Sequence, residues 1–190
     1  MFLDRDGVLA QDLGLVTEAE GLHVLPGVPE ALSALRARGL CLICASNQAV
    51  VARGLISEDE VEAINGRLDE LIVAAGGPAL DAHYFCPHHP EAALSRYRVA
   101  CDCRKPRPGL LHRAAREHGL DLAASFMVGD RLTDVAAGAS AGCSTVLVHS
   151  GRHRDEPIVT VGPPPAAIKP GFVAAALPEA VDWILAEVDG

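Results

Sequence analysis

The sequence predicts an α/β protein built on a doubly wound parallel sheet. Short apolar runs alternate with amphipathic stretches at regular spacing, which is typical of repeated β-α-β units. Polar and charged residues follow directly after several of these runs, as expected at the carboxyl ends of parallel strands. The 190 residues and a hydrophobic content of 49% suffice for one domain with a substantial core. We therefore expect residues 1–190 to form a single domain.

Six apolar runs predict strands, and the stretches between them predict helices. The strands are expected at Met1–Leu3, Leu40–Ala45, Ala82–Phe85, Ser125–Val128, Thr145–Val148 and Phe172–Ala174. The helices are expected at Pro29–Ala37, Glu58–Ala75, Gly109–His118, Leu132–Ala139 and Pro178–Val188. The first strand is unusually short for a central one, so either the chain starts upstream of Met1 or this edge of the fold is trimmed. Gly162–Pro165 marks a stiff loop before the last strand and helix.

The second of these helices has the clearest local pattern. Ser57 followed by Glu60 predicts a capping box at its N-terminus. Val61, Ile64, Leu68, Leu71 and Ala75 then recur at helical spacing, so we expect this stripe to face the core.

The charge balance limits the possible partners. Sixteen basic residues against 25 acidic residues give a net charge of −9, without a long basic run, which argues against a nucleic-acid partner. No signal-peptide pattern is present, and no apolar run reaches the roughly 18 residues that a membrane span needs. We expect a cytoplasmic protein without a membrane partner, and a monomer.

Six cysteines in such a chain argue against a disulfide framework. Cys41 and Cys44 lie in one apolar run that predicts a buried strand, where residues three apart face opposite sides. We interpret them as small core residues and not as a redox or zinc pair. Cys143 precedes another strand and is interpreted in the same way.

The other three cysteines form part of a predicted metal site. Cys86 and His88 are followed by Cys101 and Cys103, and this Cys₃His set can close tetrahedrally around zinc. The zinc loop at 86–103 leads directly into Arg104 and Lys105. A closed site would fix where this basic pair points, which predicts an anion-binding pair held by a metal.

Four polar clusters are expected to meet at one end of the sheet, because ligands of parallel α/β sheets bind beyond the carboxyl ends of the strands. The clusters contain four carboxylates, a hydroxyl and a lysine, contributed by Asp4, Asp6, Ser46, Lys105, Asp130 and Asp134. Each cluster alone is weak evidence for a site. Their joint order and spacing are strong evidence.

This order resembles the four motifs of the haloacid dehalogenase-like (HAD) phosphohydrolases across nearly the whole chain. The resemblance implies a Rossmann-like HAD fold, with Asp4 as the nucleophile that forms an aspartyl-phosphate. Asp6 would be the general acid and base, while Ser46 and Lys105 would bind the phosphoryl oxygens.

The same resemblance implies a magnesium ion. The ion would bind Asp4, Asp130 and the backbone carbonyl of Asp6, while Asp134 would bond a metal-bound water in an outer position or orient Lys105. An alternative for Asp134 is a helix-capping carboxylate in the first turn.

No room is left for the cap domain that many members of this superfamily carry. One loop and one helix fill the gap between the first two motifs, and a helix, a strand and the cysteine loop fill the next. Specificity is therefore expected to come from the loops Ala10–His23, Gln48–Ile56 and Cys86–Cys103.

Within the superfamily, the cysteine segments resemble those of the D-glycero-D-manno-heptose 1,7-bisphosphate 7-phosphatases. This resemblance implies that Cys86, His88, Cys101 and Cys103 bind a structural zinc ion. His89 is an alternative ligand by its chemistry, whereas the motif spacing selects His88. The resemblance also implies substrate contacts from Asp12, Asn47, Gln48, Arg53, Arg104 and Arg131.

Two alternatives remain at this point. Histidinol-phosphate phosphatases have a similar zinc loop, and other small phosphosugars are possible substrates. From a different class, a zinc-stabilised binding module would use Cys86–Cys103 to contact a partner, but it leaves the carboxylate set unexplained.

Overall fold

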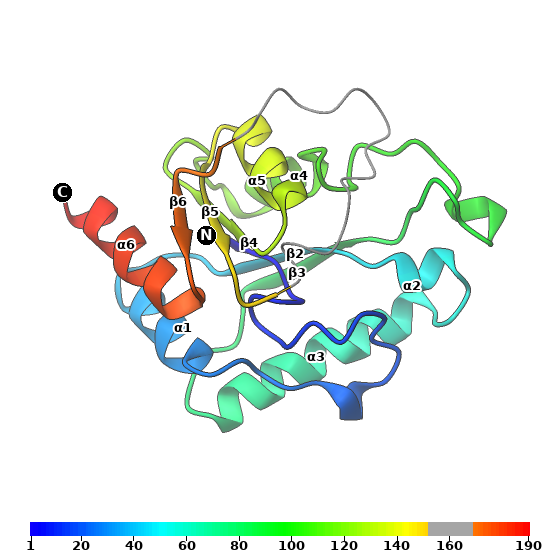
Figure 1. Ribbon diagram of the computed structural model, residues 1–190, viewed down its shortest axis with the longest axis horizontal. Coiled ribbons are helices and arrows are strands. Elements are labelled where there is room, and N and C mark those ends of the chain that lie inside the picture. The colour runs from blue at the N-terminus through cyan, green and yellow to red at the C-terminus, as the bar shows by residue number, and fades with distance from the viewer. Residues whose placement is uncertain (152–168) are drawn as a thin grey trace.

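The computed structural model describes residues 1–151 and 169–190, and the loop predicted at Gly162–Pro165 lies outside them. Six parallel strands form one sheet in the order β3-β2-β1-β4-β5-β6 (Figure 1). Their bounds are β1 Phe2–Leu3, β2 Ile43–Asn47, β3 Ala82–Cys86, β4 Phe126–Gly129, β5 Ser144–Val148 and β6 Phe172–Ala174. The order reverses at β1, so the predicted doubly wound sheet is confirmed, with its switch point between β1 and β4.

Helices cover both faces of the sheet (Figure 1). One face carries α1 Val28–Ala37, α3 Glu58–Ala74 and α6 Leu177–Asp189, and the other carries α4 Gly109–His118 and α5 Leu132–Ala141. The connections also contain α2 Ala49–Ala52 and the 3₁₀ turns η1 Ala19–Gly21 and η2 Ser95–Tyr97. The segment from β1 to β2 contains η1 and α1, and the segment from β2 to β3 contains α2 and α3. The rest of both segments forms loops.

Alternating side chains of the short central strands form two separate cores. Leu3 and Val128 pack with α1, α3 and α6, while Phe2 and Met127 pack with α4 on the opposite face. All four side chains are fully buried. A two-residue strand therefore suffices at the centre, because β2 and β4 pair with it on both sides.

The capping box predicted for α3 is present. The Glu60 amide donates to Ser57 Oγ at 3.2 Å, and the Ser57 amide donates to a Glu60 carboxylate oxygen at 2.7 Å. The predicted stripe is confirmed for Val61, Ile64 and Leu68, which are buried. Leu71 is partly buried, and Ala75 follows the end of α3 and is exposed, so the stripe stops short of its predicted end.

The second strand differs from the prediction. The apolar run indicates Leu40–Ala45, but β2 spans Ile43–Asn47 because its pairing with β3 continues to the Asn47–Cys86 register. Cys41 therefore precedes the strand and is partly buried, whereas Cys44 and Cys143 are buried core residues as predicted. No helix of the described residues has the length and hydropathy of a membrane span.

Candidate active site

The candidate active site lies where β1, β2 and β4 end. Asp4 directly follows β1, and its amide donates to the Val128 carbonyl on β4 at 2.9 Å. Asp130 directly follows β4, and Asp134 lies in the first turn of α5. One carboxylate oxygen from each of Asp4, Asp130 and Asp134 can be chosen so that all three lie within 4.8 Å of one another. We call these three residues together with Lys105 the carboxylate site.

Lys105 is the buried cation of this site. Its Nζ lies 2.9 Å from Asp4 Oδ1 and 2.6 Å from Asp134 Oδ1, and it also donates to the Ala45 carbonyl at 2.7 Å. Only 2% of Lys105 is exposed. Burial alone would lower the pKa of Lys105, but the neighbouring carboxylates of Asp134 and Asp4 raise it. The ammonium group is therefore held in its charged form between two carboxylates.

The nucleophile candidate Asp4 has opposing influences. Burial raises the pKa of Asp4 above its usual value, the charge of Lys105 lowers it, and the carboxylate of Asp134 raises it again. The net direction is upward. Additional positive charge close to Asp4 would therefore favour the ionised, nucleophilic form.

Asp130 is fully buried beside the loop that follows Asp4. Gly7 has a φ of +83°, and a Cβ atom there would lie 2.6 Å from Asp130 Oδ2. Glycine is thus required at this position for both conformational and steric reasons. The loop can approach Asp130 closely only because no side chain intervenes.

Asp6 directly precedes Gly7 and is partly exposed. Its Oδ1 accepts from Arg5 Nε at 3.2 Å, and its Oδ2 accepts from Arg5 Nη2 at 3.0 Å and Gln48 Nε2 at 3.1 Å. Gln48 Nε2 also lies 3.3 Å from Ser46 Oγ. Asp6 and Ser46, two of the side chains predicted to take part in the reaction, therefore share a neighbour in Gln48.

Asn47 fixes the backbone of Lys105. Its Nδ2 donates to the Lys105 carbonyl at 3.0 Å, and its Oδ1 accepts from the Lys105 amide at 3.0 Å. Asn47 and Gln48 were predicted as substrate contacts, yet both side chains bind other parts of the protein. Their bonds position Lys105 and Asp6.

The remaining predicted substrate residues differ in their contacts and exposure. Asp12 Oδ2 lies 3.0 Å from Arg131 Nη2, which joins two of them in an ion pair. Arg104 Nη1 donates to the His88 carbonyl at 3.0 Å, so Arg104 is tied to the cysteine loop. Arg53 directly follows α2 and is exposed.

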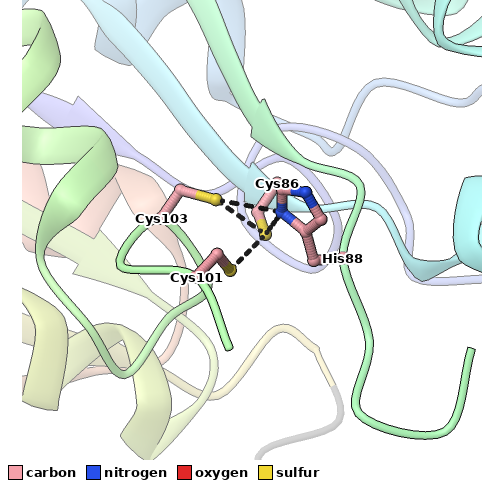
Figure 2. A group of neighbouring side chains, drawn as sticks. All are labelled: Cys86, His88, Cys101 and Cys103. Atoms are coloured by element: carbon pink, nitrogen blue, oxygen red, sulfur yellow. Dashed lines mark hydrogen bonds between the residues drawn. The ribbon is translucent and has the colours of Figure 1, made fainter. Parts of the chain in front are cut away.

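Cys86, His88, Cys101 and Cys103 converge at the end of β3 (Figure 2), and we call them the cysteine site. Cys86 Sγ lies 3.1 Å from Cys103 Sγ and 3.6 Å from Cys101 Sγ, and His88 Nδ1 lies 3.3 Å from Cys103 Sγ. Zn–S bonds of 2.3 Å in a tetrahedron imply sulfur separations of about 3.8 Å. The four side chains can therefore hold a metal ion after small movements. His89 Nδ1 instead accepts from the Glu91 amide at 3.1 Å.

The thiols of this site favour different protonation states. The hydrogen bond to Cys103 and burial raise the pKa of Cys86, and burial raises that of Cys101. The hydrogen bond from Cys86 contributes most to lowering the pKa of Cys103, to about 5. Burial and the negative charge of one thiolate therefore oppose the ionisation of a second thiol in this site.

Sequence reasoning missed Arg5 and Asn65. Arg5 stands between the two aspartates of the first motif, and Asn65 is a buried polar residue of α3, where its Oδ1 accepts from Arg5 Nη1 at 3.2 Å. The sequence did offer one signal for Asn65, because it is a polar residue next to the apolar stripe of α3.

A family comparison first gives the class of protein. The family model described as HAD-hydrolase-like matches residues 102–180, which include Lys105, Asp130 and Asp134. The parallel sheet and the buried lysine among carboxylates agree with a hydrolase of this class.

Individual relatives define the family more closely. The D-glycero-D-manno-heptose-1,7-bisphosphate 7-phosphatase of Thermosynechococcus vestitus is 42% identical over 187 residues, covering 97% of this chain and 94% of that protein. The D-glycero-β-D-manno-heptose-1,7-bisphosphate 7-phosphatase of Escherichia coli K12 is 40% identical over 153 residues, 80% of each chain. A crystal structure of the D,D-heptose 1,7-bisphosphate phosphatase of B. bronchiseptica, with magnesium and phosphate, has a TM-score of 0.80 at 33% identity and covers 98% of both chains.

This chain therefore belongs to the heptose 1,7-bisphosphate 7-phosphatase family of HAD-like hydrolases, and it is a phosphoric monoester hydrolase. The family and the HAD-like fold predicted from the sequence are both confirmed.

Proposed function

We propose that this enzyme removes the 7-phosphate of D-glycero-D-manno-heptose 1,7-bisphosphate through an aspartyl-phosphate on Asp4. The observation that carries the chemistry is the buried Lys105 ammonium group, 2.9 Å from Asp4 and 2.6 Å from Asp134. An ammonium group at this position can neutralise phosphoryl oxygens next to the nucleophile. The relatives named for this substrate support the choice of sugar.

Magnesium fits the donor set of the carboxylate site, because a hard cation prefers oxygen ligands and these carboxylates lie within 4.8 Å of one another. We assign Asp4, Asp130 and the backbone carbonyl of Asp6 as its ligands. Asp134 already forms an ion pair with Lys105 and accepts a hydrogen bond from the Arg131 amide, which suits an outer role. When bound, magnesium would supply positive charge that keeps Asp4 ionised and offsets charge on the phosphoryl group.

The chain's own residues perform the proton and phosphoryl transfers. Asp4 attacks phosphorus, and the bond to the sugar oxygen breaks as Asp6 gives that oxygen a proton. A water molecule then attacks the aspartyl-phosphate and loses its proton to Asp6, which releases phosphate and regenerates Asp4. Ser46 and Lys105 donate hydrogen bonds to the phosphoryl oxygens in both steps.

A bisphosphate carries a second anionic group that an arginine can hold bidentately. We assign this group to Arg104, whose side chain is anchored at the His88 carbonyl. Arg131 and Arg53, with Asp12 as the partner of Arg131, would contact the rest of the substrate. Asn47 and Gln48 would act on substrate mainly through Lys105 and Asp6.

Zinc fits the cysteine site, since three thiolates and one imidazole give a closed tetrahedral set. With no open position, the ion would be structural. It would hold Arg104 and Lys105 in place because both directly follow Cys103.

We further propose that the enzyme is a cytoplasmic monomer that binds neither nucleic acid nor membrane. The net charge of −9 supports the absence of a polyanionic partner.

A panel of phosphate esters with magnesium tests the proposed function. The panel contains the α and β anomers of the heptose 1,7-bisphosphate, other phosphosugars and histidinol phosphate. We expect the highest kcat/KM with a heptose bisphosphate, and Asp4→Asn to lower it by a factor of about 10⁴ or more. Preference for histidinol phosphate would reassign the substrate, and full activity of Asp4→Asn would overturn the mechanism.

A further inference from the structure

Arg5 is a deeply buried charged side chain next to the proposed general acid and base. Only 1% of it is exposed, although it lies in the loop directly after β1. Its Nε and Nη2 approach the two oxygens of Asp6 as a fork, at 3.2 and 3.0 Å. This bidentate geometry fixes the plane of the Asp6 carboxylate as well as its distance.

Two further residues fix the guanidinium group itself. Gln48 Oε1 accepts from Nη2 at 2.9 Å, and Asn65 Oδ1 accepts from Nη1 at 3.2 Å. Gln48 follows β2 and Asn65 belongs to α3, so separate elements converge on Arg5. Both partners are 3% exposed. Burying a charged group costs free energy unless it has a full set of partners, so an apolar side chain would fill a purely packing position at a lower free-energy cost.

The bonds to Asp6 distinguish its two oxygens. Among the described residues, Oδ2 accepts two hydrogen bonds, from Arg5 and Gln48, whereas Oδ1 accepts one, from Arg5. A carboxylate oxygen offers about two acceptor positions. Oδ2 is thus fully used, and Oδ1 retains one position while the side chain is 19% exposed.

We propose that Arg5, held by Gln48 and Asn65, is a positioning residue that aims Oδ1 of Asp6 at the leaving oxygen. The proposal rests on the proposed function, in which Asp6 is the general acid. Proton transfer requires heavy-atom distances of roughly 2.6–3.2 Å, and a misplacement of about 1 Å can cost a factor of about 10². Arg5 would therefore act on the rate of proton transfer through Asp6, without touching the substrate.

Leaving-group dependence separates this role from a structural one. A sugar leaves as an alkoxide unless it is protonated, whereas a nitrophenolate leaves readily without a proton. We would compare kcat/KM for the heptose bisphosphate and for nitrophenyl phosphate, because this parameter reports the transfer to Asp4 for both. Asp6→Asn is the reference for loss of the general acid.

Arg5→Lys keeps a positive charge but cannot hold both Asp6 oxygens and both amide partners. We expect it to lower kcat/KM about 10²-fold for the sugar and less than about 5-fold for the aryl ester. Asn65→Ala removes one anchor at a helical position that favours alanine, so it is expected to fold and to give the same pattern at about 10-fold. Arg36→Met breaks the distant ion pair with Asp81 and serves as the matched control, with neither substrate affected.

Equal losses on both substrates, or no loss, in folded Arg5→Lys and Asn65→Ala would overturn the positioning role. If Arg5→Lys does not fold, Asn65→Ala alone decides. If Asp6→Asn itself loses both substrates equally, the general-acid role of Asp6 in the proposed function fails instead.

Discussion

The carboxylate site and the cysteine site lie beyond neighbouring strand ends, but they balance charge in different ways. Lys105 stands between Asp4 and Asp134, so the carboxylate site contains its own cation. In the cysteine site, burial and neighbouring thiols raise the pKa of Cys86 and Cys101, which opposes a full set of thiolates. We therefore expect the first site to be assembled before the proposed magnesium ion binds, and the second to need the proposed zinc ion to hold all its cysteines as thiolates.

This difference matches the proposed division of tasks. A pre-assembled site can bind and release a hard cation and a phosphate group during turnover. A site that depends on its metal is suited to fixing the loop that leads to Arg104 and Lys105.

Lys105→Met gives the largest expected effect, because it removes the internal cation. Asp4 and Asp134 would be left as buried carboxylates without their shared partner, at a cost of about 3–5 kcal/mol in unfolding free energy. We expect kcat to fall at least about 10³-fold as well, since phosphoryl charge loses its donor. Urea unfolding and phosphate release measure the two effects.

The double variant with Asp134→Asn provides the control. Removing one carboxylate should recover part of the stability and none of the activity. Recovery of activity would show that Lys105 serves only to neutralise Asp134.

Gly109→Ala tests how the cysteine site depends on the packing of its loop against α4. A Cβ atom at Gly109 would lie 2.5 Å from the Asp102 carbonyl oxygen, so the loop between Cys101 and Cys103 must move away from α4. We expect a loss of about 1–3 kcal/mol in unfolding free energy and weaker zinc retention.

Gly66→Ala is the matched control, because the added methyl group meets no atom within 4 Å in the exposed part of α3. It should raise stability by about 0.5–1 kcal/mol. Equal effects of the two substitutions on zinc retention would refute the tight contact between loop and helix.

The ion pair between His83 and Asp69 is a further, partly buried charged contact, and its pH dependence can be compared with the behaviour of the two sites. His83 Nε2 on β3 lies 2.9 Å from Asp69 Oδ2 on α3. Burial alone would lower the pKa of His83, but the contact with Asp69 and the nearby Cys44 raise it to about 10. Because the folded pKa exceeds the ordinary value of 6.5, the contact stabilises fully below pH 6.5 and is lost as the pH rises towards 10.

The wild type should therefore exceed His83→Gln in unfolding free energy by about 1–3 kcal/mol below pH 6.5 and by little near pH 10. Urea titrations at both ends of this window measure the difference. A constant difference across the window would contradict the raised pKa.

The sequence predicted those parts of the site that depend on strand ends. Asp4 and Asp130 follow apolar runs, and parallel strands bring such positions to one edge. Arg5 and Asn65 escaped prediction because their contact joins residues 60 positions apart, which no local pattern encodes. The predicted end of the second strand was wrong, because pairing with β3 extends β2 to Asn47, beyond the apolar run.

The melting temperature with each metal removed in turn tests the central claim most directly. Removing zinc should abolish the structural site and lower the melting temperature by about 10 °C or more, since structural zinc contributes many kcal/mol. Omitting magnesium supplied at about ten times its Kd should cost only about 1.4 kcal/mol, or about 3–6 °C, while abolishing turnover. Equal losses of melting temperature on removing either metal would contradict the division between a chemical and a structural site.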